Sequence, residues 1–184
     1  ELADYRWCRL YNHPNDVVIN FDALTYAGNL ENLQEIKTHP NYRFVLGDLR
    51  KPSDISKAFS EYNIEAVIHL AAESHVDRSI HGPADFIETN ITGTFNLLET
   101  ALKFWGAELR AHRFLHVSTD EVYGSLGSEG KFSESTAYAP NSPYSASKAA
   151  SDHLVRAWHH TYKMNVVTTN RSNNTNACAD TRGG

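Results

Sequence analysis

The chain has 184 residues and a formal net charge of −5, from 17 Lys and Arg against 22 Asp and Glu. Hydrophobic residues make up 41% and charged residues 21%, a composition typical of folded globular proteins that argues against a disordered chain. The slight acidity gives no electrostatic reason to bind nucleic acid or an anionic membrane, and no apolar run approaches the length of a membrane span. We therefore expect neither partner.

Cys8 and Cys178 are the two cysteines of the chain. They offer neither a disulfide framework nor the spacing of metal ligands, so we expect no metal site. Low cysteine usage favours a reducing compartment, and we predict a cytoplasmic protein. The first residues, ELADYRWCRL, lack both a signal-peptide pattern and an initial Met, so we expect a fragment.

Helices and strands are expected to alternate along the chain. We predict helices at residues 2–12, 29–37, 52 onward, 82–105 and 142–163. We predict strands at 16–22, 42–48, 66–72, 113–118 and 165–170, with a Gly-, Ser- and Pro-rich loop at 124–141. The strand AVIHLAA is nearly continuous in apolar residues, which is typical of burial on both faces. This order predicts an α/β fold, a doubly wound parallel sheet of Rossmann type with helices on both faces.

The expected Rossmann-type fold is incomplete. A dinucleotide-binding fold begins with a strand and a glycine-rich turn before its first helix, and this chain starts inside that helix. DVVINFD at 16–22 is then the second strand, whose terminal acid binds the adenosine ribose hydroxyls. Asp22 suits that role, although an ordinary turn is the better explanation of a strand-ending Asp taken alone.

Tyr144 and Lys148 are four residues apart in PYSASK, on one face of the predicted helix. A nearby ammonium stabilises tyrosinate and lowers the pKa of the phenol, which makes Tyr a usable base. This spacing is also common on helix surfaces. The preceding Pro143 and the small residues around the pair favour a site that a ligand approaches closely.

The segment STDEVYG at 118–124 directly follows a predicted buried strand. In open α/β sheets the ligand lies at the carboxyl ends of the strands, which is where Thr119, Asp120 and Glu121 are expected. A Thr hydroxyl can bind a substrate oxygen, and two neighbouring carboxyl groups can serve as acid and base if their environments differ. A polar turn is the alternative for this segment alone, but its combination with Tyr144 favours a shared site.

The segment HLAAESHVDRS at 69–79 ends another predicted strand. The small Ala71 and Ala72 leave room for a flat ligand over the backbone, and Ser74 can hydrogen-bond a ligand. The charged residues at 75–78 fit either a cluster near the site or a solvated turn.

These segments together resemble a known family. The motifs are LTYAGN (24–29), HLAAESHVDRS (69–79), ETNITGT (88–94), STDEVYG (118–124), YAPNSPYSASKAASDHLVRAW (138–158) and SNN (172–174). From about residue 16 to 174 the chain resembles the dTDP-glucose 4,6-dehydratases of the extended short-chain dehydrogenase/reductase family. Sugar-nucleotide 4-epimerases generally lack the Asp–Glu pair, and GDP-mannose dehydratases carry the Glu without the preceding Asp.

The resemblance implies a lyase that uses NAD internally. Tyr144 takes the proton of the sugar C4 hydroxyl while hydride passes from C4 to NAD, and Thr119 binds the C4 oxygen. Glu121 then removes the C5 proton, and Asp120 protonates the departing C6 hydroxyl. Hydride returns to C6, giving a 4-keto-6-deoxy sugar nucleotide, a precursor of deoxysugars such as rhamnose. Lys148 binds the nicotinamide ribose and lowers the Tyr144 pKa.

The resemblance also implies ligand contacts. For NAD they are Asp22, Ala23, Leu24, Thr25, Asp48, Leu49, Leu70, Ala71, Ala72, Glu73, Ser74, Thr89, Tyr144, Lys148 and Asn174. For the sugar nucleotide they are Ser74, Thr119 and Asn173.

The chain departs from the family at both ends. The glycine-rich loop is missing, and after SNN the chain reads TNACADTRGG in place of a substrate-binding lobe. We therefore predict a partial NAD-binding Rossmann domain at 1–174, an atypical, disordered or aberrant tail at 175–184, and an inactive fragment of an active parent enzyme. Rival interpretations are a UDP-glucose 4,6-dehydratase, a UDP-sugar 4-epimerase, and a non-catalytic NAD-binding fragment.

The predicted helices at 83–105 and 142–163 carry more apolar residues than one stripe requires. We predict a homodimer in which these two helices of each subunit form a four-helix interface, which the resemblance also implies. The alternative is that a neighbouring helix or the missing lobe covers them within one chain.

Overall fold

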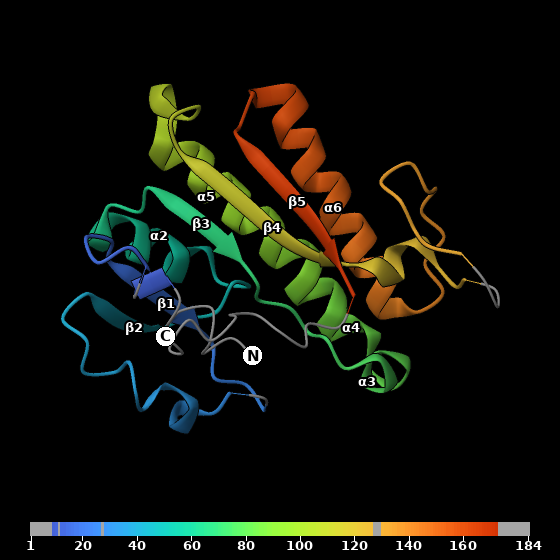
Figure 1. Ribbon diagram of the computed structural model, residues 1–184, viewed down its shortest axis with the longest axis horizontal. Coiled ribbons are helices and arrows are strands. Elements are labelled where there is room, and N and C mark those ends of the chain that lie inside the picture. The colour runs from blue at the N-terminus through green and yellow to red at the C-terminus, as the bar shows by residue number, and fades with distance from the viewer. Residues whose placement is uncertain (1–8, 11, 27, 127–129, 173–184) are drawn as a thin grey trace, which may run out of the picture. The chain divides into compact units, whose positions relative to one another are not determined.

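The computed structural model describes residues 9–10, 12–26, 28–126 and 130–172 (Figure 1). The chain divides into two compact units, one reaching Gly47 and the other spanning Asp48–Ser172, and each is described by itself. Within the described ranges, every helix is too short or too polar to cross a membrane.

The smaller unit has two parallel strands, β1 (Val18–Asp22) and β2 (Tyr42–Leu46), with Val18 opposite Tyr42. Both strands match the sequence prediction. A cluster of buried residues, Leu10, Leu33, Ile36 and Tyr42, holds this unit together.

Part of the helix predicted at 2–12 is described: residues 9, 10 and 12 are helical, and the rest lies outside the described residues. The helix predicted at 29–37 is wrong, because only the short 3₁₀ helix η1 (Leu30–Leu33) forms there, followed by turns. The buried Leu33 and Ile36 are three residues apart, and the Ile36 amide donates to the Leu33 carbonyl. A spacing of three fits the 3₁₀ repeat better than the α-helical one.

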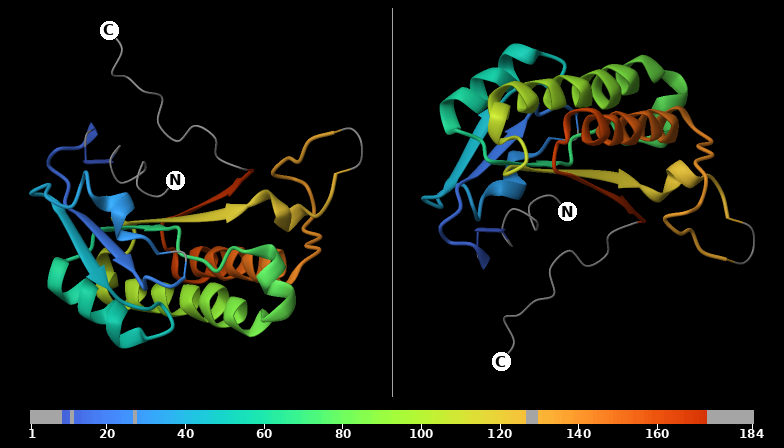
Figure 2. Two further views of the ribbon diagram at one scale, coloured as in Figure 1. Left: turned by 90° about the horizontal axis from the view of Figure 1, so that it is seen from below. Right: turned by 90° about the horizontal axis from the view of Figure 1, so that it is seen from above.

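The larger unit contains a parallel sheet with the strand order β3-β4-β5. Its elements are α2 (Pro52–Tyr62), β3 (Ala66–His69), α3 (Val76–His81), α4 (Pro83–Phe86), the π-helical η2 (Ile87–Thr92), α5 (Gly93–Trp105), η3 (Gly106–Glu108), β4 (Arg113–Thr119), η4 (Asp120–Tyr123), α6 (Pro143–Tyr162) and β5 (Val166–Arg171). Helices α5 and α6 lie side by side on one face of this sheet (Figure 2).

Most predicted elements of this unit are confirmed, including the helix that begins at Pro52, the strand β4 and the long helix α6. The helix predicted at 82–105 is continuous in extent but contains the π-helical turn η2, which the periodicity did not predict. A strand forms within 66–72 as predicted, but its predicted end and its predicted burial on both faces are wrong. Strand β3 ends at His69, and Ile68 keeps 40% of its surface exposed, because the described helices of the larger unit lie on the other face of its sheet (Figure 2).

The two sheets agree with an incomplete Rossmann-type fold. The standard strand order is 3-2-1-4-5-6. Strands β1 and β2 correspond to the second and third strands of that order, and β3, β4 and β5 correspond to the fourth, fifth and sixth. Without its first strand, the standard order leaves the second strand beside the third, and the fifth between the fourth and the sixth. The pairs β1-β2, β3-β4 and β4-β5 are the same neighbours.

Candidate functional site

The candidate site lies where strand β4 ends and η4 begins. Thr119 caps η4: its Oγ1 accepts a hydrogen bond from the Glu121 amide at 3.3 Å and donates to Asp120 Oδ1 at 3.4 Å. The strand end thus presents a hydroxyl and two adjacent carboxyl groups, as the sequence predicted.

Helix α6 brings Tyr144 to this strand end. The helix begins with a capping box, in which Ser142 and Ser145 satisfy each other's backbone amides, and Pro143 occupies its first turn. These residues fix the start of the helix, so Tyr144 lies in the first turn. Its side chain is only 9% exposed, packs edge-on against Phe86 and hydrogen-bonds Thr119.

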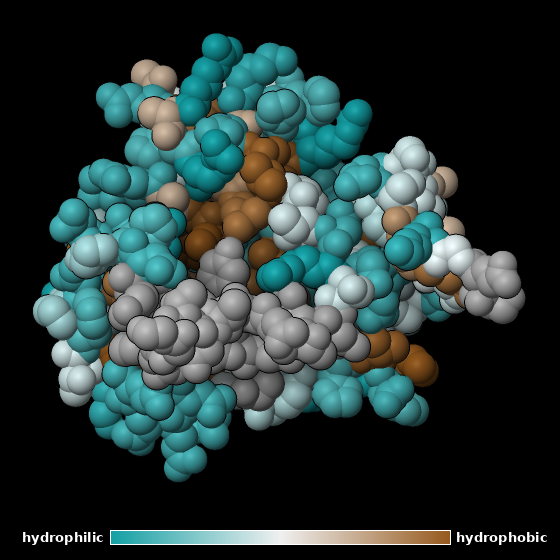
Figure 3. All heavy atoms as spheres, viewed as in Figure 1, coloured by the Kyte–Doolittle hydropathy of each residue, from teal (hydrophilic) through white to brown (hydrophobic). Residues whose placement is uncertain are grey.

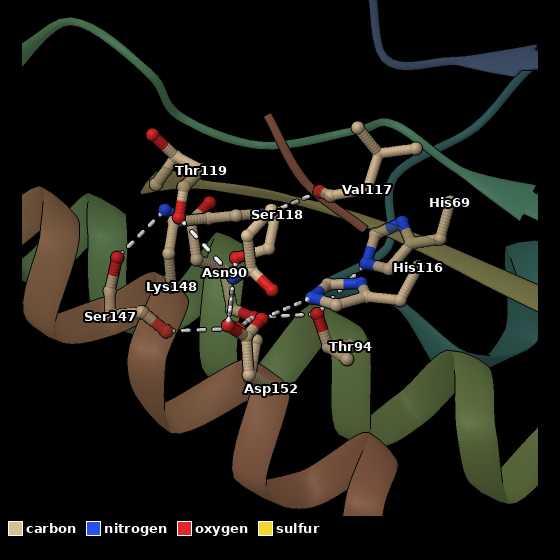
Figure 4. Close-up of polar contacts among 12 residues, drawn as sticks. His69, Asn90, Thr94, His116, Val117, Ser118, Thr119, Ser147, Lys148 and Asp152 are labelled. Carbon is tan, nitrogen blue, oxygen red and sulfur yellow. Dashed lines mark hydrogen bonds and ion pairs between the residues drawn. The ribbon is translucent and has the colours of Figure 1, made fainter. Parts of the chain in front are cut away.

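The pKa of Tyr144 is raised above its ordinary value in this structure. Burial is the largest cause, the negative charge of Glu121 adds to it, and the hydrogen bond with Thr119 opposes it. The expectation that Lys148 lowers this pKa is not met here, because the ammonium Nζ donates to the Val117 carbonyl at 2.8 Å instead (Figure 4).

Lys148 is a buried cation beneath the strand end. Only 4% of the surface of Lys148 is exposed. Burial lowers its pKa to about 8, and the negative charge of Asp152 opposes that shift. A lysine with this pKa can change its charge near neutral pH, which surface lysines do not do.

The two carboxyl groups of the strand end lie close enough to influence each other. Burial raises the pKa of Glu121, and the neighbouring charge of Asp120 raises it further. A carboxyl group whose pKa moves toward neutrality is better suited to proton transfer.

Asp152, on the same helix as Tyr144 and Lys148, collects four hydrogen bonds. His116 Nε2 donates to its Oδ1 at 3.0 Å. Its Oδ2 accepts from Ser118 Oγ at 2.9 Å, Tyr138 OH at 2.9 Å and Asn170 Nδ2 at 3.2 Å. Burial raises the pKa of Asp152, but the hydrogen bonds from His116 and Ser118 outweigh it, so the group is a carboxylate.

Asn90, a buried polar residue within the π-helical turn η2, also links separate segments. Its side-chain amide accepts from the Glu73 amide at 2.8 Å and donates to the Glu73 carbonyl at 2.9 Å and to Ser147 Oγ at 2.8 Å. It therefore ties the segment after β3 to helix α6. The sequence analysis missed Asn90 and Asp152. Available signals were a polar residue inside an apolar helix and an acid one turn beyond Lys148 on the same face.

The remaining predicted residues of the larger unit lie in several segments. Asp48 is held by Arg50, whose guanidinium lowers its pKa, although burial opposes the shift. The Leu49 carbonyl accepts from Asn96. Between β3 and α3 lies a segment without regular secondary structure, which contains Leu70, Ala71, Ala72, Glu73 and Ser74, and Thr89 lies in η2.

The predicted charged segment at 75–78 belongs mostly to the short helix α3, with His75 as its N-cap. Among the described residues, His, Cys, Asp and Glu form no group of three or more that could hold a metal ion.

In the smaller unit, Asp22 ends strand β1 and uses its carboxylate in a local turn, accepting from the Leu24 amide at 2.8 Å. Leu24 has a φ of 47°, a conformation that costs energy for a residue with a branched side chain. Ala23 and Thr25 flank it. Asn173 and Asn174 lie outside the described residues.

The comparisons with known proteins agree with one another. A family model described as GDP-mannose 4,6 dehydratase matches residues 8–182. A dTDP-glucose 4,6-dehydratase of Xanthomonas campestris is 58% identical over 161 residues, covering 85% of this chain and 46% of that protein. One of Salmonella typhimurium is 52% identical over 178 residues, covering 90% and 49%. The chain spans about half the length of these relatives.

Solved structures give the same pattern. A dTDP-glucose 4,6-dehydratase of Bacillus anthracis in complex with NAD is 40% identical, with a TM-score of 0.81, over 93% of this chain and 51% of that one. A UDP-glucose 4-epimerase of Thermus thermophilus in complex with NAD is 27% identical, with a TM-score of 0.78, over 91% and 50%.

Proposed function

The chain belongs to the GDP-mannose 4,6-dehydratase family, and from that premise we propose that it is the NAD-binding half of a dTDP-glucose 4,6-dehydratase. The observation that carries the proposal is the strand end at which Thr119, Asp120 and Glu121 meet Tyr144 of helix α6. The 58% identity to a relative of that name supports the choice of substrate.

In this proposal each side chain has a role in proton transfer or binding. Thr119 binds the C4 oxygen of the sugar, and Tyr144 takes the proton of the C4 hydroxyl. Glu121 removes the proton at C5, and Asp120 gives a proton to the C6 hydroxyl, which leaves as water. Glu121 returns the proton to C5 when C6 receives hydride. The shared position of these groups at one strand end lets them act on three neighbouring sugar carbons.

We propose NAD as the cofactor, which when bound accepts hydride from C4 and returns it to C6. The donor set supports it, because a buried Lys and Tyr lie at one strand end as partners for ribose and nicotinamide. The small Ala71 and Ala72 leave the backbone after β3 accessible, and Asn90 holds the next residue, Glu73, at both its amide and its carbonyl.

The test uses the full-length native polypeptide that carries this sequence, supplied with dTDP-glucose. We expect a 4-keto-6-deoxy product, detected by mass spectrometry as the loss of one water. Asp120→Asn with Glu121→Gln should still reduce bound NAD, seen by NADH absorbance, but release little product. Tyr144→Phe should slow NADH formation about 10²-fold or more.

Glu61→Gln, an exposed change on helix α2, is the control and should leave both steps unchanged. A double variant at Asp120 and Glu121 that dehydrates at the parent rate contradicts the assignment of these two residues. Near-normal hydride transfer in Tyr144→Phe contradicts its role as base.

A second candidate is a UDP-sugar 4-epimerase, favoured only by the fold shared with the Thermus thermophilus enzyme at 27% identity. Offering UDP-glucose beside dTDP-glucose separates the candidates, since an epimerase releases an isomer of unchanged mass. NAD titration of the 184-residue chain tests whether it binds cofactor without the rest of the protein.

We propose that residues 1–174 act as one NAD-binding domain, in the cytoplasm, where NAD and nucleotide sugars are available.

We also propose a homodimer built on helices α5 and α6. Phe95 is 42% exposed and Tyr162 45% exposed, and both contact Trp158, which gives an aromatic strip across the two helices. Leu98 is 0% exposed and belongs to the core, so a charge there tests folding instead. Phe95→Glu should yield monomers in sedimentation of the full-length polypeptide, and a persistent dimer contradicts this interface.

A further inference from the structure

Resting on the proposed function, we propose that Asp152 is a positioning residue, which fixes the helix carrying Tyr144 and Lys148 onto the strand carrying Thr119. Asp152 lies four residues after Lys148 and eight after Tyr144, so all three share one face of α6. Its carboxylate accepts hydrogen bonds from three other segments of the chain, namely β4, β5 and the segment that contains Tyr138. We call this hydrogen-bonded group around Asp152 the hub.

The register of the sheet explains why the hub forms there. His116 and Ser118 are two residues apart on β4, so both point toward the helices. Asn170 of β5 is the register partner of Ser118 and points to the same side. All three donors therefore converge on the one carboxylate that α6 presents, which is 4% exposed.

The hub reaches the reacting groups on both sides. The amide Nδ2 of Asn170 donates to Asp152 at 3.2 Å and to the Thr119 carbonyl at 3.3 Å. On the helix side, Lys148 donates to the carbonyl of Val117, which lies between His116 and Ser118. Loss of the carboxylate leaves these strand donors without their acceptor, and the contact between Tyr144 and Thr119 depends on the same packing.

The hub also holds the segment between η4 and α6. Tyr138 donates its hydroxyl to Asp152, and its ring packs on Tyr123 and His153 at centroid distances of 5.2 and 5.3 Å. The Ala139 amide donates to the Val122 carbonyl of η4. Asp152 thus joins four elements whose mutual placement sets the distance between Asp120, Glu121 and Tyr144.

The test is Asp152→Asn in the full-length polypeptide, which keeps the shape but turns an acceptor oxygen into a donor amide facing other donors. We expect kcat for dTDP-glucose to fall about 10- to 100-fold with KM within about twofold, because misplaced reacting groups affect the chemical step more than binding. Glu61→Gln should leave both unchanged.

Amide hydrogen exchange separates positioning from general instability. The variant should exchange faster at the carboxyl ends of β4 and β5, around Ser118 and Asn170, and keep wild-type rates near Phe114 and Val166, which are register partners at the other end. Uniform acceleration along both strands overturns the proposal, as does a kcat within twofold of wild type in an active enzyme.

Tyr138→Phe is the second variant, should Asp152→Asn fail to fold. It removes one of the four hydrogen bonds with little change in volume, so we expect a few-fold fall in kcat and the same local pattern of exchange. Wild-type kcat with unchanged exchange in this variant overturns the proposal. If the wild-type polypeptide lacks dehydratase activity, the proposed function fails, and the exchange pattern alone decides whether Asp152 holds this end of the sheet.

Discussion

The two faces of strand β4 differ in an instructive way. Toward α5 and α6, it presents Phe114, His116 and Ser118, with exposures of 0%, 0% and 6%. On the opposite face, Leu115 and Val117 are only partly buried. The inner face thus buries two polar side chains, whereas the apolar Leu115 and Val117 of the outer face keep part of their surface in solvent.

The register extends this difference across the sheet. Ile68, Leu115 and Val167 are partners in one row of the outer face, and Ile68 and Val167 remain 40% and 37% exposed. In the space-filling view from this side, hydrophobic atoms gather over these strands (Figure 3). On the inner face, His69 Nε2 donates to Thr94 Oγ1 and His116 Nε2 donates to Asp152, which offsets part of the cost of burying these rings, although His116 Nδ1 has no partner in the described part of the chain. Burial on the inner face serves to hold specific groups in place, whereas the outer face offers area for further packing.

The largest expected effect is the loss of an inner apolar side chain. Phe114→Ala should lower the free energy of unfolding by about 3–5 kcal/mol, because it leaves a cavity in a fully buried site. The neighbouring Leu115→Ala, on the outer face, should cost no more than about 1.5 kcal/mol, since less area is buried there. Urea unfolding of the 184-residue chain measures both. Equal losses would show that the two faces are equally well packed.

Lys148 gives the inner face a pH dependence. The folded state releases its proton near pH 8, and the unfolded chain does so near 10.5, so raising the pH across this window favours folding. The wild type should therefore gain stability relative to Lys148→Met, by up to about 1.4 kcal/mol per pH unit. Urea unfolding between about pH 7 and pH 10 measures the gain.

The matched control for that series is Lys57→Met, an exposed change on helix α2. In this variant the free energy of unfolding should change with pH as steeply as it does in the wild type. If the free energy of unfolding changes equally with pH in the wild type and in Lys148→Met, Lys148 is hydrated in solution.

His69 should act at acidic pH. Burial, with the nearby charges of His116 and Lys148, holds the pKa of His69 well below the ordinary 6.5. The unfolded chain takes up a proton below that pH and the folded chain does not, so stability falls as the pH is lowered. His69→Gln, which can still pair with Thr94, should flatten this fall by up to about 1.4 kcal/mol over the first pH unit. The exposed His13→Gln should leave the decline unchanged, and a decline that persists in His69→Gln assigns it to other groups.

The sequence predicted the reacting groups better than the residues that hold them. Thr119 and Tyr144 stand out because they follow a strand end and open a helix, both of which are local patterns. Asp152 and His116 are 36 residues apart, and their contact depends on how α6 packs on β4. Strand alternation gives the side of the sheet, but not the partner on the helix.

The wrong prediction that the strand within 66–72 is buried on both faces has a related cause. An apolar run is typical of burial on both faces, yet Ile68 is partly exposed because the described helices of the larger unit cover one face. The sequence carries the preference of each side chain, and the number of covering layers is a property of the whole fold.

The smallest effect in the 184-residue chain is expected on the outer face. Val167→Lys should change its free energy of unfolding by within about 0.5 kcal/mol, because a partly exposed position lets the ammonium remain in water. Relatives are about twice as long as this chain, and further packing on the apolar row of Ile68, Leu115 and Val167 is expected in the full-length polypeptide. There the same change should cost about 2 kcal/mol or more, since the charge loses water without gaining a partner. Val166→Lys, on the inner face, should destabilise both chains strongly. The measurement is the free energy of unfolding of both chains, with and without Val167→Lys. An equally small cost in both chains shows that the outer face remains exposed to solvent in the full-length polypeptide.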